Sequence, residues 1–142
     1  MSAAGVEIEV IWADDHMLRL DVSASNGVFA GRIEAYAALD VAAQWAAALD
    51  GFPGDGDDCR EVSTPTLSDE YAGGGATMRF VVRDSAGRCA VQVRLRASDM
   101  VRPIASAEFT IAVDAAAVDR FVAELRAMSS EVGQRAVLAG YS

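Results

Sequence analysis

Arginine side chains at strand-like spacing are the feature of this sequence that most directly suggests chemistry. They alternate with apolar residues on two neighbouring stretches and comprise Arg79, Arg83, Arg94 and Arg96. Residues two or four apart on a strand project from the same face, so we expect all four on the polar side of one hairpin. Guanidinium groups pair with carboxylates, and arginine is enriched at protein interfaces. The pattern predicts either a surface that recognises a protein partner or a salt-bridged solvent face that protects the sheet from aggregation.

A second polar set lies on earlier stretches of the same alternating kind and comprises Arg19, Arg32, Glu34 and Tyr36. If these stretches join the same sheet as the hairpin, their side chains extend the arginine surface. They would also place an aromatic ring beside the guanidinium groups, which suits a protein partner.

An acidic segment with Asp55, Asp57 and Asp58 is the second candidate site. It lies within 50–61, which has the length of an EF-hand loop and an acid at each end. The interior fails that motif, because Phe52 stands where a ligand is needed and Asp55 stands where the turn needs glycine. We predict a solvated acidic loop that attracts a basic partner and holds no metal ion. Weak, flexible binding of a cation by the three aspartates is the alternative.

Motifs for phosphate binding, nucleophilic catalysis and zinc binding are not recognisable in the sequence. The glycines at 73–75 precede a strand and no lysine follows them, unlike a phosphate-binding loop. His16 follows two aspartates at a predicted turn, without the further ligands or the nucleophile that a site needs. Cys59 and Cys89 make no disulfide framework, and we interpret them as an exposed thiol and a core residue. We expect no catalytic residue, no cofactor and no metal, and so no enzyme activity.

The composition is that of an acidic globular protein. Its 142 residues are 52% hydrophobic and 23% charged, with a formal net charge of −9 at pH 7. This length predicts one domain, 1–142, with a sizeable core. The charge disfavours nucleic acid, whose phosphates need a basic surface. No leader-like start and no stretch of about 18 apolar residues is seen, so we expect a cytoplasmic protein and no membrane contact.

The first half of the chain reads as three strands and a helix. Apolar residues alternate with polar ones over 6–12, where Val6, Ile8, Val10 and Trp12 share one side, and again over 18–22 and 28–36. The third strand follows a turn at Asn26-Gly27 and places Phe29 on its apolar side. The period then changes to that of a helix over 41–52, with Asp40 as N-cap and Gly51 near its end.

The second half repeats this order after a long connection. The segment 51–75 is rich in glycine and acid, with room for one short strand near 60–63. Alternation then predicts strands over 78–82, 91–95 and 105–113, and helical spacing predicts a helix over 118–128 capped by Asp114. The segment 129–142 reads as a C-terminal tail or one more short helix.

The predicted fold class is α+β, in the order βββαβββα. Each strand has one apolar face and each helix one apolar stripe. The economical arrangement is an antiparallel sheet of about six strands with both helices packed on one face, which leaves the other face in water.

The segments DVAAQWAAALDGF after the third strand and AEFTIAVDAAAVDRFVAEL before the tail carry a resemblance. Together with the element order they resemble small bacterial α+β families of unknown function, over 6–128. Some proteins of this layout look like immunity proteins encoded beside secreted toxins. The resemblance implies a fold and a type of partner, and it carries no functional residue.

Two hypotheses about function follow. The first is a non-catalytic interaction module, in its immunity-type version an inhibitor whose Asp55, Asp57 and Asp58 contact a basic toxin. A homodimer is a further partner to consider. The alternative is a small-molecule-binding protein or an enzyme, with a pocket between the sheet and the 51–75 connection where Tyr71, Trp45 and Cys59 line a cavity.

Overall fold

The structure is a computed structural model that describes residues 3–64, 75–97 and 105–141. Within them the elements follow the order βββαββββαβ. Their bounds are β1 Gly5–Ala13, β2 Met17–Ser25, β3 Ala30–Ala38, α1 Val41–Leu49, β4 Cys59–Ser63, β5 Gly75–Val82, β6 Arg88–Ala97, β7 Ala105–Asp114, α2 Ala115–Ala127 and β8 Arg135–Ala139. The α+β class is confirmed, and so is the general order of the elements.

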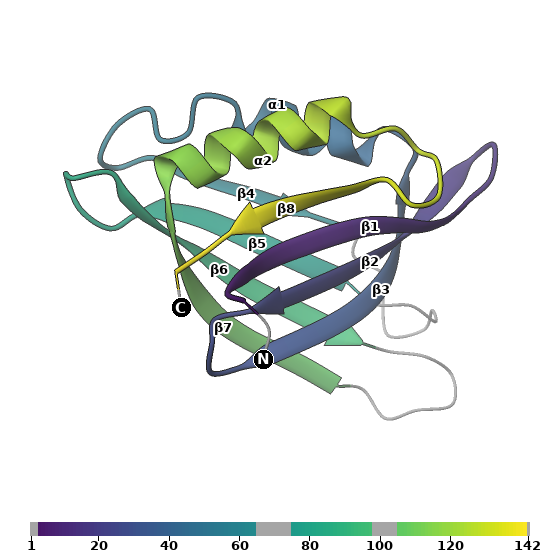
Figure 1. Ribbon diagram of the computed structural model, residues 1–142, viewed down its shortest axis with the longest axis horizontal. Coiled ribbons are helices and arrows are strands. Elements are labelled where there is room, and N and C mark those ends of the chain that lie inside the picture. The colour runs from purple at the N-terminus through teal and green to yellow at the C-terminus, as the bar shows by residue number, and fades with distance from the viewer. Residues whose placement is uncertain (1–2, 65–74, 98–104, 142) are drawn as a thin grey trace.

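The strands form two antiparallel sheets of four strands each, so the expectation of one sheet of about six strands is wrong. Sheet A has the order β3-β2-β1-β8 and sheet B the order β4-β5-β6-β7. Figure 1 shows the two sheets facing each other, with both helices along the upper side. The apolar faces of the two sheets cover each other, and the helices close one open side of this pair rather than coating one face of a single sheet.

The core lies between the two sheets and under the helices. It joins residues of every layer, including Ile8 of β1, Met78 of β5 and Phe121 of α2, which are all fully buried. Strand β3 packs across β5 and β6, and at Gly31 an added Cβ would lie 2.9 Å from Leu95 Cδ1. Glycine at this position therefore lets the two sheets approach closely.

The C-terminal segment forms strand β8, so the expectation of a tail or short helix over 129–142 is wrong. Gly133, with φ of 95°, turns the chain, and β8 then pairs with β1 as its antiparallel neighbour. Ala136 and Leu138 are buried, while Arg135 and Val137 face outward. After β8 the chain reaches the edge of sheet B, where Tyr141 forms a β-bridge with Ala112 of β7.

Both helices begin where the sequence predicts. At α2 the Asp114 carboxylate accepts a hydrogen bond from the Ala117 N–H at 2.7 Å, which confirms the N-cap. At α1 the Asp40 side chain accepts instead from Gln44 Nε2 at 2.8 Å. Gly51, with φ of 74°, ends α1 in the conformation that favours glycine. Within the described residues, neither helix is long and apolar enough to cross a membrane.

Candidate functional site

The predicted arginine surface lies on the outer face of sheet B. The register pairs Thr77 with Arg94, Arg79 with Gln92 and Gly75 with Arg96, which sets these three arginines on one face. Arg83 follows the last residue of β5, where its N–H bonds to Arg88 O at the hairpin turn. The polar side chains Arg19, Arg32, Glu34 and Tyr36 belong to sheet A, so they do not extend this surface.

Acidic side chains and a thiol occupy the same face of sheet B. Arg94 Nε lies 3.3 Å from Glu108 Oε2, in an exposed ion pair on the neighbouring strand. Arg79 Nε donates to Cys59 Sγ at 3.1 Å, and Glu61 stands opposite Arg79 in the register. The hydrogen bond to Cys59, and then the electrostatic interaction with the same side chain, raise the pKa of Arg79. These contacts are those of a paired, solvent-facing sheet surface.

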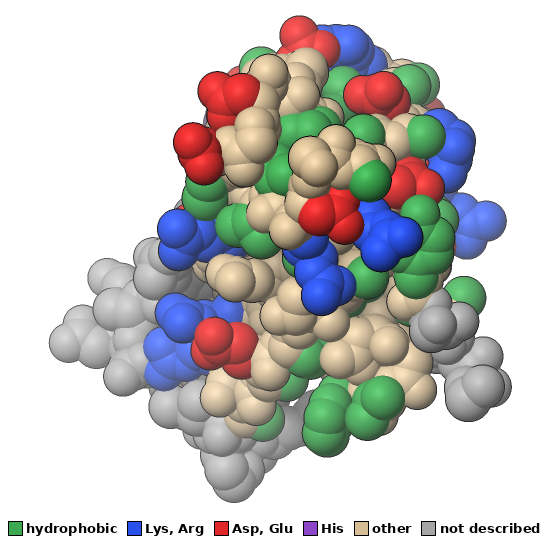
Figure 2. Space-filling model, turned by 90° about the vertical axis from the view of Figure 1, so that its left-hand side faces the viewer, with side chains coloured by type: hydrophobic (Ala, Val, Ile, Leu, Met, Phe, Trp, Pro, Cys, Tyr) green, Lys and Arg blue, Asp and Glu red, His purple; other side chains and the backbone are tan. Residues whose placement is uncertain are grey.

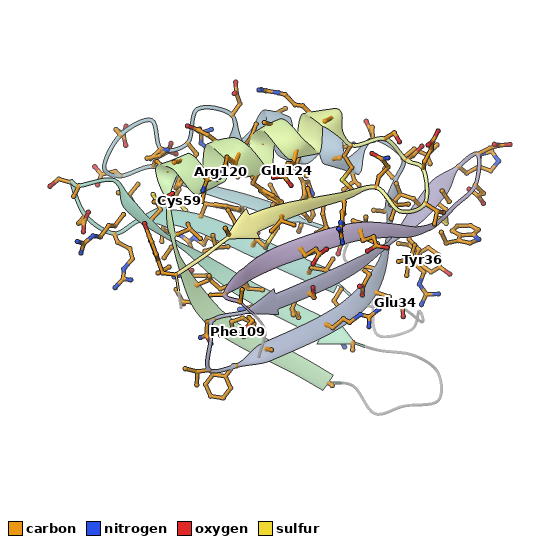
Figure 3. The ribbon with its side chains drawn as sticks, in the orientation of Figure 1. Glu34, Tyr36, Cys59, Phe109, Arg120 and Glu124 are labelled. Carbon is orange, nitrogen blue, oxygen red and sulfur yellow. The ribbon has the colours of Figure 1, made fainter. Side chains whose placement is uncertain are left out.

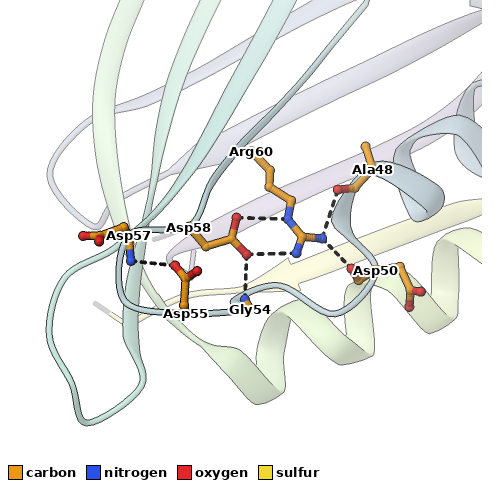
Figure 4. Close-up of polar contacts among 7 residues, drawn as sticks. All are labelled: Ala48, Asp50, Gly54, Asp55, Asp57, Asp58 and Arg60. Carbon is orange, nitrogen blue, oxygen red and sulfur yellow. Dashed lines mark hydrogen bonds and ion pairs between the residues drawn. The ribbon is translucent and has the colours of Figure 1, made fainter.

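The acidic loop between α1 and β4 is held together by Arg60 (Figure 4). The Asp58 carboxylate accepts from Arg60 Nε at 3.2 Å and Nη2 at 2.9 Å, and also from the Gly54 N–H at 2.6 Å. Arg60 Nη1 donates to the carbonyls of Ala48 and Asp50 at the end of α1. These bonds to Arg60 and Gly54 hold the pKa of Asp58 below its usual 3.8. Asp58 therefore fastens the loop to the helix through Arg60.

The other two aspartates of the loop are exposed. Asp55 Oδ1 accepts from the Asp57 N–H at 2.9 Å, which is a local turn bond. In the part of the chain that the structure describes, no three His, Cys, Asp or Glu side chains come together in a way that could hold a metal ion. Figure 2 shows acidic and arginine side chains mixed over one face of the molecule.

The sequence predicts a pocket between the sheet and the 51–75 connection, and the structure describes two of its three proposed lining residues. Trp45 is buried in the core, and its Nε1 donates to Ser63 O at 3.3 Å. Cys59 is exposed on the outer face of sheet B. Tyr71 lies outside the described residues. Trp45 and Cys59 thus lie in different environments, one in the core and one on the surface.

A second exposed surface lies at one end of sheet A, on its outer face, where Arg19 and Tyr36, which the sequence singled out, are joined by Trp12 and Met17, which it did not. We call it the aromatic patch: Trp12, Met17, Arg19 and Tyr36. The pairing of β1 with β2 shifts between Val10 and Trp12, where Val10 pairs with Leu20 but Trp12 pairs with Arg19. This bulge inserts Ile11 and reverses the side on which Trp12 projects. The expectation that Trp12 shares the buried side of Val10 is therefore wrong, and 43% of Trp12 is exposed.

The side chains of the aromatic patch contact one another. The rings of Trp12 and Tyr36 meet edge to face at 6.3 Å between centroids, and the Arg19 guanidinium lies 5.3 Å from the Tyr36 centroid. Arg19 Nε is 3.1 Å from Glu34 Oε1, which is an ion pair without hydrogen-bond geometry. Met17 lies two residues before Arg19 on β2 and is 40% exposed. Figure 3 places Tyr36 and Glu34 at the opposite end of the molecule from Cys59.

Carboxylates surround the aromatic patch. The β1–β2 turn carries Asp14 and Asp15, and Asp14 Oδ1 accepts from the N–H groups of His16 and Met17 at 2.8 and 2.9 Å. These two backbone bonds lower the pKa of Asp14 below its usual 3.8, so it stays ionised at neutral pH. Two residues further along this face, Asp21 of β2 is paired with Glu34 of β3. The charge of Arg19 is offset by Glu34 and that of Arg32 by Asp21, so the acidic charge near the patch comes from Asp14 and Asp15 of the β1–β2 turn.

Comparison of this chain with protein-family models, with curated proteins and with solved structures found no match.

Proposed function

We propose that this protein is a non-catalytic interaction module that binds a basic protein partner through the aromatic patch. The observation that carries the proposal is the bulge in β1, which turns Trp12 out of the core and packs it against Tyr36. Regular alternation would bury Trp12 in the core. Because the bulge turns this side chain toward solvent, it forgoes the stabilisation that burial of its apolar surface would give. Bulges that re-aim a side chain are common next to functional sites.

The residue types of the aromatic patch support a protein partner. Tryptophan, tyrosine and arginine dominate the binding energy of protein interfaces, and methionine is enriched there. Trp12 and Tyr36 restrain each other, and Arg19 is held between Tyr36 and Glu34. Side chains that are already ordered lose less entropy when a partner binds.

The charge of the surroundings supports a basic partner. Asp14 and Asp15 follow Trp12 closely in the β1–β2 turn, and the whole chain carries a formal net charge of −9. A lysine or arginine of the partner can rest on the exposed face of Trp12 by a cation–π contact while these carboxylates attract it. An immunity-type inhibitor of a basic toxin is one form of this proposal, acting in the cytoplasm. In that form, the β1–β2 turn takes the role that the sequence predicts for Asp55, Asp57 and Asp58.

The site chemistry supports binding more than catalysis. The carboxylates nearest to arginines, such as Asp58 with Arg60 and Glu108 with Arg94, are engaged in ion pairs on the surface or in loops. Enzyme sites instead gather titratable groups with strongly shifted pKa values in a cleft. The core between the two sheets is filled by apolar side chains.

A capture experiment tests the proposal. The folded chain is immobilised, exposed to an extract of its source cells, and eluted at low and high salt. Trp12→Ala should reduce retention of the partner by roughly tenfold or more, as for an interface hot spot. High salt should also weaken retention, because attraction between opposite charges is screened.

Two control variants make the result specific. Arg94→Ser alters an exposed ion pair of sheet B, and Asp57→Asn alters the acidic loop. Both should retain the partner as the wild type does. Loss of the partner with Arg94→Ser but not with Trp12→Ala would move the site to the arginine surface. Loss with Asp57→Asn alone would move it to the acidic loop.

A further inference from the structure

Arg19 provides the positive charge of the aromatic patch, and one nitrogen of its side chain is unsatisfied. Its guanidinium lies 5.3 Å from the centroid of the Tyr36 ring. Its Nε lies 3.1 Å from Glu34 Oε1 without hydrogen-bond geometry, and this buried nitrogen has no hydrogen-bond partner among the described residues. A buried donor without an acceptor costs free energy, so such a group in a folded protein needs a physical explanation.

A neighbouring ion pair on the same face shows what complete pairing looks like. Arg32 of β3 donates from Nε to Asp21 Oδ1 of β2 at 2.6 Å. This hydrogen bond, and then the charge of Asp21, raise the pKa of Arg32. The outer face of sheet A can therefore hold a hydrogen-bonded arginine and carboxylate between these two strands. The incomplete contact of Arg19 with Glu34 is thus particular to the place that Arg19 occupies.

The two rings beside Arg19 stand at right angles to each other. The register pairs Arg19 with Trp12 of β1 and with Tyr36 of β3. Two strands on either side of a third are about 10 Å apart. The ring centroids are only 6.3 Å apart, with 90° between the planes, so the rings lean toward each other over β2. Aromatic rings that meet in this way, with a carboxylate such as Glu34 nearby, suit the binding of a cation.

We propose that Trp12, Tyr36 and Glu34 form a binding site for an arginine of the partner, and that Arg19 occupies this site in the free protein. The inference rests on the proposed function, because it names the group that the aromatic patch recognises. Arg19 is tied to β2, and from there it reaches the Tyr36 ring without completing a hydrogen bond to Glu34. An arginine that arrives from solvent lacks this restraint. It can stack on the ring and present two N–H donors to the carboxylate.

The site is open enough to solvent for this exchange. The side chains of Arg19 and Glu34 are 38% and 45% exposed. Arg19 can therefore move outward into water, where its side chain regains rotamer freedom. The exchange replaces one guanidinium with another, so the charge within the site stays the same. While Arg19 occupies the site, it lowers the apparent affinity for the partner, because only the vacated state can bind.

An exposed aromatic ring alone does not make such a site. The sequence places Phe29 on the apolar side of a strand that starts at position 28, and this expectation is wrong. Strand β3 begins only at Ala30, so Phe29 lies in the preceding turn and is 64% exposed. Among the described residues its ring meets no other ring and no guanidinium group. Phe29 is therefore a matched control for the rings of the aromatic patch.

Titration of the purified chain with a short peptide, followed by NMR, tests the proposal. The probe is a capped tripeptide with arginine between two glycines, and its control carries citrulline, which has a similar shape without the charge. Arg19→Ala vacates the site, so it should bind the arginine peptide about five- to tenfold more tightly than the wild type does. The citrulline peptide should bind much more weakly to both chains, because it lacks the cation that the rings and Glu34 attract.

Arg32→Ala is the matched control variant. It removes one guanidinium from the same face of sheet A, and so it changes the net charge by the same amount as Arg19→Ala. Because Arg32 pairs with Asp21 away from the rings, this variant should bind the arginine peptide as the wild type does. Adding Tyr36→Leu to Arg19→Ala should abolish the gain in affinity, whereas adding Phe29→Ala should preserve it. Backbone amide spectra confirm that each variant is folded.

Three results would overturn the inference. They are arginine-peptide binding by Arg19→Ala that is no tighter than that of the wild type, an equal gain with Arg32→Ala, and equal binding of the citrulline peptide. The capture experiment fails separately, because it depends on a partner in the extract and the peptide titration does not. A partner captured through Trp12, together with a failed titration, would overturn this inference alone and leave the proposed function standing.

Discussion

The indole ring of Trp12 meets the ring of Tyr36 edge to face, with 6.3 Å between their centroids and 90° between their planes. The two residues come from β1 and β3, which both pair with β2, and Arg19 of β2 stands between them in the register. This relationship depends on the bulge at Ile11, because regular alternation would turn Trp12 into the core. One irregular residue thus turns a position that alternation would bury into an exposed one.

The two tryptophans should respond differently to substitution. Trp45 is 3% exposed, so Trp45→Ala should lower the free energy of unfolding by roughly 3–5 kcal/mol through loss of packing. Trp12→Ala should cost only about 0.5–1.5 kcal/mol, the value of an aromatic pair. Chemical denaturation of both variants measures this difference. Equal losses would mean that Trp12 is a core residue and that the bulge is misassigned.

Arg60 should matter more for stability than the exposed arginines. Arg60→Ala leaves Asp58 without its ion-pair partner and removes the donor to the carbonyls at the end of α1, so we expect a loss of about 1–3 kcal/mol. Arg94→Ser, in an exposed pair, should cost less than about 1 kcal/mol. Urea unfolding of the two variants gives the comparison. An Arg60→Ala variant as stable as Arg94→Ser would show that the loop is not held through Arg60.

The contact between Asp114 and Tyr141 should make stability depend on pH at both extremes. The Tyr141 hydroxyl donates to Asp114 Oδ2 at 2.7 Å. This bond, followed by the Ala117 N–H, lowers the pKa of Asp114 below 3.8, and the same bond raises the pKa of Tyr141 above 10.0. Stability from the lowered carboxyl is lost as pH falls below about 4, and stability from the raised phenol is lost as pH rises above about 10.

Tyr141→Phe tests this contact. The variant should be less stable than the wild type at neutral pH, and the difference should shrink toward strong acid and toward strong alkali. Free energies of unfolding measured across the pH range provide the readout. A constant difference at every pH would mean that the phenol contributes only packing.

Calcium or zinc should leave the melting temperature nearly unchanged. Asp58 is committed to Arg60 and Gly54, and the remaining loop acids Asp55 and Asp57 provide too few ligands for a closed site. A bound ion would stabilise the fold in proportion to the logarithm of its concentration. Thermal melts with and without millimolar metal decide the matter. A rise of several degrees that a chelator reverses would restore the loop as a metal site.

Local patterns predicted most elements, because the cause of each lies within a few residues. Alternating side chains marked β5 to β7, and Asp114 marked the start of α2. The short strand β4 also falls where the sequence left room for it. The arrangement of two sheets was not predictable in this way, because a strand with one apolar face can be covered by a helix or by another sheet.

Strand β8 and the exposure of Trp12 were missed because their causes are not local. Ala136 and Leu138 alternate over only five residues of β8, too few to separate a strand from a short helix, and the partner strand β1 is at the other end of the chain. Trp12 continues the alternation of Val6 to Val10, so only the pairing with β2 reveals the bulge. A bulge adds one residue without changing composition, and no residue type marks this one.

Photocrosslinking in the source cells tests the interaction surface most directly. A photoreactive amino acid is placed at Met17, within the aromatic patch, or at Gln92, on the outer face of sheet B. The account predicts an adduct with another protein from position 17, its loss when Trp12→Ala is added, and no such adduct from position 92. An adduct from position 92 alone, no adduct from position 17, or only an adduct of the chain with itself at position 17 would contradict it.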